Sequence, residues 1–189
     1  MKYHELRHSA AHVLASAVKE LFPKAKLAIG PAIEDGFYYD FDFRPFTPED
    51  LAKLESKCKE IISKTYKFER SKKTRKEAEK ILKDEPYKLE LLKDLKDGEI
   101  TFYSHGNFAD LCKGPHVSST GEVKGFKLLK TSGAYWKGDS KNKQLQRIYG
   151  LAFETKDELE NYLKLQEEAE KRDHRKLGKE LGLFMLSEE

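Results

Sequence analysis

Cysteine is scarce in this sequence, and long apolar runs are absent from it. The 189 residues include only Cys58 and Cys112, which are too few and too far apart to suggest a disulfide framework. The N-terminus, from Met1 to Glu5, has no apolar signal core, and no stretch approaches the length of a transmembrane helix. These features argue against a disulfide-stabilised secreted domain and a membrane-spanning protein. They predict a soluble protein of the reducing cytoplasm.

A large excess of one charge is also lacking, because 36 basic residues face 33 acidic ones and the net charge is +3. The distribution is uneven, however. Between residues 64 and 80, eight Lys and Arg residues stand against three Glu residues, and a second basic cluster covers residues 171–179. Such stretches can follow a phosphate backbone, although a solvated helix face gives the same pattern.

Hydrophobic periodicity divides the chain into helices and strands. Apolar residues recur at helical spacing over residues 4–22, and a proline ends the run. Thr47 and Pro48 mark a second helix, to about Lys64, as its N-cap and first helical residue, and Thr74 opens a capping box with Glu77. Further helices are expected over 88–95 and 156–181. Strands are expected at 27–29, 37–43, 66–68, 100–103, 125–130 and 145–153.

These elements predict an α+β fold, in which an antiparallel sheet packs around the long N-terminal helix in two layers and a C-terminal linker helix follows. Residues 1–153 are expected to form the domain and residues 154–189 the linker. The apolar stripe of the last helix thins out around Gln166 and Asp173, a pattern typical of a helix that bridges two bodies.

Two pairs of residues spaced four apart carry the strongest chemical signal. His8 and His12 project from one face of the N-terminal helix. A Gly-Pro dipeptide separates Cys112 from His116, which rules out a regular helix there and places that pair on a tight turn after a strand. The four residues together suit a tetrahedral zinc ion, and Asp110 adds a carboxylate to the cluster. Each pair taken alone is also compatible with packing.

Several blocks of the sequence resemble the editing, or second additional, domain of bacterial-type threonyl-tRNA synthetases. The blocks follow the order of that family and span nearly the whole chain. They are Arg7–His12, Ile29–Pro31, Gly36–Asp40, Tyr87–Lys88, Asp110–His116, Ser132–Asp139, Gln146–Gly150 and Lys171–Gly178. The two four-spaced pairs would also fit the alanyl-tRNA editing proteins. The Ser132–Asp139 block and the tail from Lys171 point to the threonyl branch.

The resemblance implies post-transfer editing in protein biosynthesis, by an aminoacyl-tRNA deacylase that hydrolyses serine wrongly esterified to threonine tRNA. Editing is needed because a binding pocket gains only about 1–3 kcal/mol from the single methyl that distinguishes threonine from serine. Compared with the family, the small N-terminal domain and the class II catalytic core are missing, so ligase activity is not expected here. The chain is expected to be a fragment or a freestanding factor, and the bridging helix favours the fragment. The expected partners are the acceptor 3′ end of threonine tRNA and the rest of the synthetase, with no membrane.

The resemblance guides the assignment of catalytic roles to His8, Lys88, Asp110 and Cys112. His8 would hold or deprotonate the attacking water, or contact the ribose 2′-hydroxyl. Lys88 would place positive charge near the oxyanion or the terminal adenosine, and Asp110 would receive the serine α-ammonium or orient an imidazole. Cys112 is expected to position water and not to attack the ester, because only an imidazolium nearby would lower the pKa of its thiol.

Substrate-binding roles are assigned to His12, Gly30, Tyr39, His116 and Trp136. The small residues around Gly30, with Tyr39 behind them, would exclude the extra methyl of threonine, and Trp136 would stack on or flank the tRNA 3′ end. Core packing is the alternative for Tyr39 and Trp136, and an exposed position is the alternative for Lys88.

No cofactor is required by this mechanism, although His8, His12, Cys112 and His116 would accept zinc. Other functions stay open at this stage. A zinc-stabilised RNA-binding module without catalysis would explain the basic clusters and the ligand set, and an alanyl-type tRNA editing factor would share both four-spaced pairs. A metallohydrolase for a small substrate fits the long basic helix less well.

Overall fold

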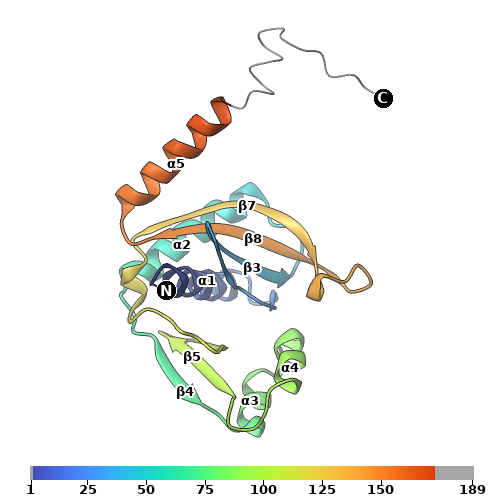
Figure 1. The fold of residues 1–189 in the computed structure, drawn as a ribbon. Coiled ribbons are helices and arrows are strands. Elements are labelled where there is room, and N and C mark those ends of the chain that lie inside the picture. The colour runs from blue at the N-terminus through green and yellow to red at the C-terminus, as the bar shows by residue number, and fades with distance from the viewer. Residues whose placement is uncertain (1, 173–189) are drawn as a thin grey trace.

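The predicted α+β class is confirmed by the computed structural model, which describes residues 2–172. Helix α1 (Lys2–Leu21) lies between two antiparallel sheets (Figure 1). The larger sheet has the order β1-β3-β8-β7, and β2 pairs with β3. Its strands are β1 (Lys26–Leu27), β2 (Ala32–Ile33), β3 (Gly36–Asp42), β7 (Gly125–Tyr135) and β8 (Gln144–Phe153). The smaller sheet consists of β4 (Glu69–Lys72), β5 (Thr101–His105) and β6 (Phe108–Leu111).

Small apolar residues allow α1 to pack closely against the larger sheet. Ala10, Leu14 and Ala17 are fully buried and share one core with Phe37 and Ile148 of the sheet. Turning this face toward the larger sheet leaves a neighbouring face of the helix, which carries the two predicted site histidines, directed at the smaller sheet. Close packing of α1 therefore determines where its histidines point.

Helix α2 (Pro48–Ser63) begins as predicted. The Thr47 hydroxyl accepts the Asp50 backbone N–H at 3.2 Å, and the Asp50 carboxylate accepts the Thr47 backbone N–H at 2.9 Å. Arg44 adds an ion pair to the same carboxylate at 2.6 Å. The helix then packs Leu54 and Ile61 into the main core. The first turn is therefore held by a reciprocal cap and a cation together.

Replacing Asp50 with alanine is expected to lower the free energy of unfolding by about 1–2 kcal/mol at neutral pH, the usual cost of a lost cap. Arg44 and the Thr47 N–H lower the pKa of Asp50 to about 2 in the folded protein, from an ordinary value of 3.8. Because the folded pKa is depressed, this stabilisation is complete above the unfolded pKa and disappears as the pH falls through the folded one. Urea denaturation of the native chain and of Asp50→Ala, from neutral pH down to the folded pKa of Asp50, measures the difference in free energy of unfolding. Glu49→Ala, one residue away and exposed, is the control, and an equal loss in it would contradict the capping role.

The smaller sheet has its own core with helices α3 (Arg75–Ile81) and α4 (Pro86–Lys93). Phe102 of β5 packs against Leu92 of α4 and Ala78 of α3. The predicted capping box of α3 is present between Thr74 and Glu77, and α4 begins two residues before its predicted start because Pro86 occupies its first turn. Helix α4 is thereby placed beside β6, at the edge of the site.

Two sequence-based expectations differ from the structure, and a third can be compared only in part. The strand predicted at 66–68 is wrong: this segment instead bonds to the loop at 118–120, through Phe68 N–H to Ser118 O and Thr120 N–H to Tyr66 O, and the regular strand starts at Glu69. Strand β7 continues past 130 to Tyr135 after a bulge. Helix α5 (Lys156–Lys171) is present, but positions 173–181 of the predicted helix lie outside the described residues.

Helix α5 packs on the body through its first turns only, where Leu159 and Tyr162 contact Phe153, and it then extends away from the sheets (Figure 1). This arrangement agrees with the predicted thinning of its apolar stripe. The division into a domain over 1–153 and a linker over 154–189 stays a prediction. No helix among the described residues is both long enough and apolar enough to cross a membrane.

Candidate functional site

The two predicted pairs converge at one place. One ligand atom each from His8, His12, Cys112 and His116 lies within 4.8 Å of the others. The Cys112 Sγ is 3.3 Å from the Nε2 of His8 and 3.3 Å from the Nε2 of His116. The histidines of α1 are separated by one helical turn, and the other pair follows β6 on a turn, as predicted. The two pairs, which lie about 100 residues apart in the sequence, therefore meet in space.

Hydrogen bonds assign the tautomers of the two outer imidazoles. The Nδ1 of His8 lies 3.3 Å from the carbonyl oxygen of Pro115, which can only accept, so Nδ1 carries the proton. The Ser9 hydroxyl donates to the Glu5 carbonyl at 2.8 Å, so it accepts the Nδ1–H of His116 at 3.0 Å. Both neutral rings therefore direct the lone pair of Nε2 toward Cys112.

Burial keeps this cluster neutral. Desolvation lowers the pKa of His8, lowers that of His12 well below its ordinary value, and lowers that of His116 to about 2. Desolvation also raises the pKa of the Cys112 thiol to about 11. At neutral pH one S–H proton is therefore shared between two imidazole lone pairs, and one of these lone pairs is always free. A thiol in this state is a poor nucleophile, as expected from the sequence.

The donor set also fits a zinc ion. Two Nε2 lone pairs already face one sulfur atom, and the buried Nδ1 of His12 has no hydrogen-bond partner among the described residues. A thiol and imidazoles of this kind are the ligands that zinc prefers. Whether the site holds a metal stays a prediction.

A buried ion pair lies beside the quartet. The Lys88 ammonium contacts Asp110 Oδ2 at 2.6 Å, and the Tyr39 hydroxyl donates to the same oxygen at 2.9 Å. Lys88 is only 4% exposed and Asp110 only 2%, so the alternative of a surface lysine is wrong. The other carboxylate oxygen, Oδ1, is buried and has no hydrogen-bond partner among the described residues. An unpartnered buried carboxylate oxygen is costly and points to a missing donor.

Three residues of the quartet, His8, His12 and Cys112, line one cavity of about 340 Å³ together with the ion pair. Its walls come from α1, the 29–31 segment, β3, α4 and β6. The lining residues include His8, His12, Gly30, Tyr39, Lys88, Asp110 and Cys112. Gly30 is required where it stands, because a Cβ atom there would lie 2.6 Å from Tyr39 Cε2. Gly30 and Tyr39 therefore lie against each other at the cavity, and the size-selective role predicted for them stays a prediction.

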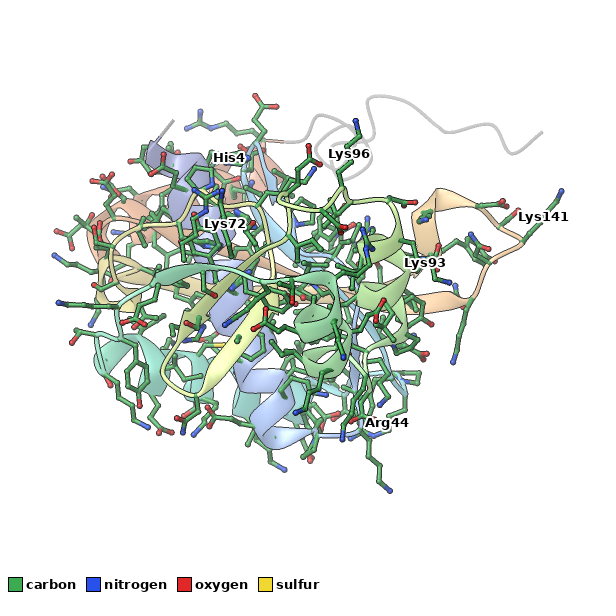
Figure 2. The ribbon with its side chains drawn as sticks, turned by 90° about the horizontal axis from the view of Figure 1, so that it is seen from below. His4, Arg44, Lys72, Lys93, Lys96 and Lys141 are labelled. Carbon is green, nitrogen blue, oxygen red and sulfur yellow. The ribbon has the colours of Figure 1, made fainter. Side chains whose placement is uncertain are left out.

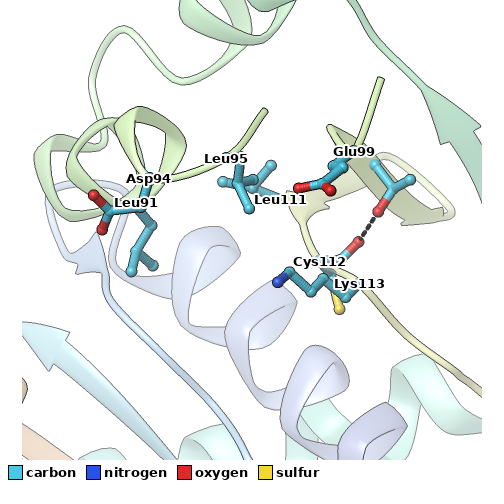
Figure 3. A pocket seen from close by; sticks show the side chains of 8 residues that line it. Leu91, Asp94, Leu95, Glu99, Leu111, Cys112 and Lys113 are labelled. Carbon is cyan, nitrogen blue, oxygen red and sulfur yellow. Dashed lines mark hydrogen bonds between the residues drawn. The ribbon is translucent and has the colours of Figure 1, made fainter. Parts of the chain in front are cut away.

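A second cavity of about 300 Å³ adjoins the first (Figure 3). The two share Leu91, Leu111, Cys112 and Lys113 as lining residues. Leu91 of α4, Leu95 just after it and Leu111 of β6 form the apolar part of its lining. Asp94 and Glu99 add two acidic residues to that lining. The two cavities therefore lie next to each other beside α4 and β6.

Trp136 is the predicted site residue that the structure places elsewhere. It is 5% exposed and packs with Ala28 and Leu145, while its indole N–H donates to Glu90 at 3.0 Å. Its ring is therefore not available to stack on a nucleotide, and the core alternative is the correct one. His116 contacts Cys112 of the quartet but does not line the cavity. Its ring stacks on Phe68 with the two centroids 4.9 Å apart.

Sequence reasoning missed the groups that orient the histidines. Ser9 accepts both the His116 imidazole and the Val117 backbone N–H, at 3.0 and 3.1 Å, and is fully buried. Tyr103 packs against His116 with ring centroids 4.5 Å apart. The signal for Ser9 was available, since it stands next to His8 on the helix, but a lone serine on a helix has many structural uses.

Comparisons with known proteins agree with this site. Residues 100–149 match the family described as the threonyl and alanyl tRNA synthetase second additional domain. The threonine–tRNA ligase of Clostridium tetani is 59% identical over 188 residues, which are 97% of this chain and 29% of that protein. Those of Acetivibrio thermocellus and Clostridium botulinum are 58% and 60% identical over 97% of this chain, which spans 29% and 30% of their length. The predicted resemblance is confirmed: residues 100–149 match the second additional domain of the threonyl and alanyl tRNA synthetases, and nearly the whole chain is similar to a part of threonine–tRNA ligases that spans less than a third of their length.

Proposed function

We propose that this site hydrolyses the ester bond between serine and the 3′ end of threonine tRNA. The observation that carries the proposal is the unpartnered Oδ1 of Asp110, buried beside Lys88 at a cavity lined by His8. The ester of an amino acid offers the two groups that such a pair would bind, because it has a cationic α-ammonium and a carbonyl oxygen on adjacent carbons. The Asp110 oxygen would accept the ammonium, which selects the first of the two roles predicted for it.

Lys88 complements the carbonyl end of the same ester. One of its three N–H groups is donated to Asp110, no second acceptor is found for the ammonium among the described residues, and Lys88 lines the cavity. Aimed at the carbonyl oxygen, it would stabilise the negative charge that develops there during attack. The serine side chain would then lie against Gly30 and Tyr39, where a threonine methyl would meet the rigid tyrosine ring.

Proton transfer is assigned to His8. When the Cys112 thiol donates to His116, the Nε2 lone pair of His8 is free to accept a proton from water as the water oxygen bonds to the ester carbon. When the bond from that carbon to the ribose oxygen breaks, the imidazolium returns the proton to this oxygen. Burial lowers the pKa of His8, which favours both the neutral base at the start and release of the proton at the end.

A zinc ion, if bound, would be held by His8, His12, Cys112 and His116 and would supply Lewis acidity to the ester carbonyl. Without it, Lys88 provides the positive charge. The terminal nucleoside would occupy the adjoining cavity. As in the longer ligases that the chain resembles, we propose that the domain acts beside a ligase core, with residues 154–189 as the connection.

Replacing His8 with alanine is expected to lower kcat/KM for seryl-tRNA about 100-fold, the usual contribution of one general base. The measurement is release of labelled serine from seryl-tRNA, with threonyl-tRNA as the substrate that should survive. His4→Ala is the matched control, because His4 lies one turn earlier on α1 and is exposed.

Two outcomes would contradict the proposal. Seryl-tRNA that is as stable with the chain as in buffer would exclude catalysis by this chain. A chain that unfolds under chelators and leaves seryl-tRNA intact would support the alternative, a zinc-stabilised RNA-binding module.

A further inference from the structure

Arg70 and Lys72 stand on the edge strand β4, on the face of the smaller sheet that holds the site. Strand pairing shows this directly, since Arg70 is opposite Tyr103, and Tyr103 is opposite Asp110. Residues opposite each other in an antiparallel sheet share a face. Asp110 of this row lines the cavity, and Tyr103 packs against His116. The row therefore leads from the cavity to the outer edge of the sheet.

Lys72 belongs to the neighbouring row. It is opposite Thr101, and the Thr101 hydroxyl donates to the Cys112 carbonyl at 2.6 Å. Alternation along β4 places Glu69 and Ser71 on the other face, where Ser71 is opposite the core residue Phe102. The one acidic residue of the strand is thus directed away from its two cations.

Neither cation is neutralised within the chain. Arg70 and Lys72 are exposed, and no carboxylate among the described residues lies within ion-pair distance of them. Lys113 is also exposed and without an ion pair among residues 2–172, and it lines both cavities. Unpaired positive charges therefore occur both at the cavities, on Lys113, and on strand β4, on Lys72 and Arg70. Two further cations of the basic segment are used internally, since Arg75 pairs with Asp97 and Lys64 with Glu60.

We propose that Lys113, Lys72 and Arg70 form a track that binds the sugar–phosphate backbone of the tRNA 3′ end as it leaves the cavity. The inference rests on the proposed function, which places the aminoacyl ester in the cavity. A single-stranded end that starts there carries a phosphate with each nucleotide, and unpaired exposed cations beside an aromatic residue are typical of surfaces that follow such a strand. Of the eight basic residues between positions 64 and 80, the track uses only Arg70 and Lys72. Lys113, which lies outside that segment, completes it.

The test compares seryl-tRNA with 3′-seryl-adenosine, which keeps the ester and the terminal nucleoside but carries no phosphate. The double variant Arg70→Ala, Lys72→Ala is expected to raise KM for seryl-tRNA about tenfold and to reduce the slope of log binding constant against log salt by about 1.4. Hydrolysis of 3′-seryl-adenosine, which has no phosphate, is expected to change less than about twofold, since no charge contact is lost with it. Lys141→Ala is the control, because this exposed lysine lies on the β7–β8 connection, far from Lys72 (Figure 2).

The outcomes separate this inference from the proposed function. If both substrates are hydrolysed and the double variant leaves the KM for seryl-tRNA and the salt slope unchanged, the proposed track is wrong, whereas the proposed deacylase function is supported. If neither substrate is hydrolysed but uncharged tRNA binds with a slope that falls in the double variant, the track stands and the deacylase is wrong. Displacement of tRNA by polyglutamate at equal charge would show a general acidic-partner surface and would overturn the track.

Discussion

Replacing Lys88 with methionine is expected to lower the free energy of unfolding by about 3–5 kcal/mol, the usual cost of leaving one partner of a buried ion pair alone. The Asp110 carboxylate would then be left with the Tyr39 hydroxyl as its only donor among the described residues, in a position that is 2% exposed. The same variant is expected to lower kcat for seryl-tRNA about 10³-fold, because the charge aimed at the carbonyl oxygen is lost. Urea denaturation measures the first effect and single-turnover hydrolysis the second.

Lys93→Met controls for the loss of a lysine from α4, since Lys93 lies in the last turn of that helix and is exposed. A second variant separates charge from packing. Adding Asp110→Asn to Lys88→Met removes the isolated charge, so most of the stability should return while activity stays low. Stability that does not return would assign the loss to packing of the methionine instead.

Much of the site was predictable because local spacing encodes it. Histidines four apart on a helix must share a face, and Gly114-Pro115 must break a helix, so the sequence alone places His8 on a helix face and Cys112 on a turn. That the two pairs meet depends on long-range packing, and only the family resemblance indicated it. The resemblance also supplied Lys88, which by composition alone reads as one more surface lysine.

The remaining differences have physical reasons. Trp136, with Tyr135 and Lys137 beside it, suggested an aromatic that stacks on a single-stranded end, yet its indole lies in a small core with Ala28 and donates to Glu90 of α4. The segment at 66–68 has the alternation of a strand, but its hydrogen bonds go to the loop that carries His116. Both outcomes are set by partners distant in sequence, which periodicity cannot reveal.

Replacing Gly30 with alanine is expected to destabilise the fold by about 3 kcal/mol, at the upper end of the range for overpacking. The new methyl would lie 2.6 Å from Tyr39 Cε2, and the ring cannot move aside easily. It is 1% exposed, stacks on Phe41 with centroids 4.8 Å apart, and is bonded through its hydroxyl to Asp110. Activity on seryl-tRNA is expected to fall about 100-fold, since a shift of about 1 Å in a positioning group has that effect.

The cause is tested in a Tyr39→Leu background. Leucine removes the ring atoms that the methyl would strike, so Gly30→Ala should cost clearly less there than in the native chain, and the difference between the two costs is the coupling energy of the pair. Equal costs in both backgrounds would mean that the glycine is needed for its backbone and not for the tyrosine. A large coupling energy between Gly30 and Tyr39 would also support the proposed exclusion of threonine. If the Tyr39 ring cannot move aside for one methyl added to the protein, it cannot move aside for the extra methyl of a threonine substrate.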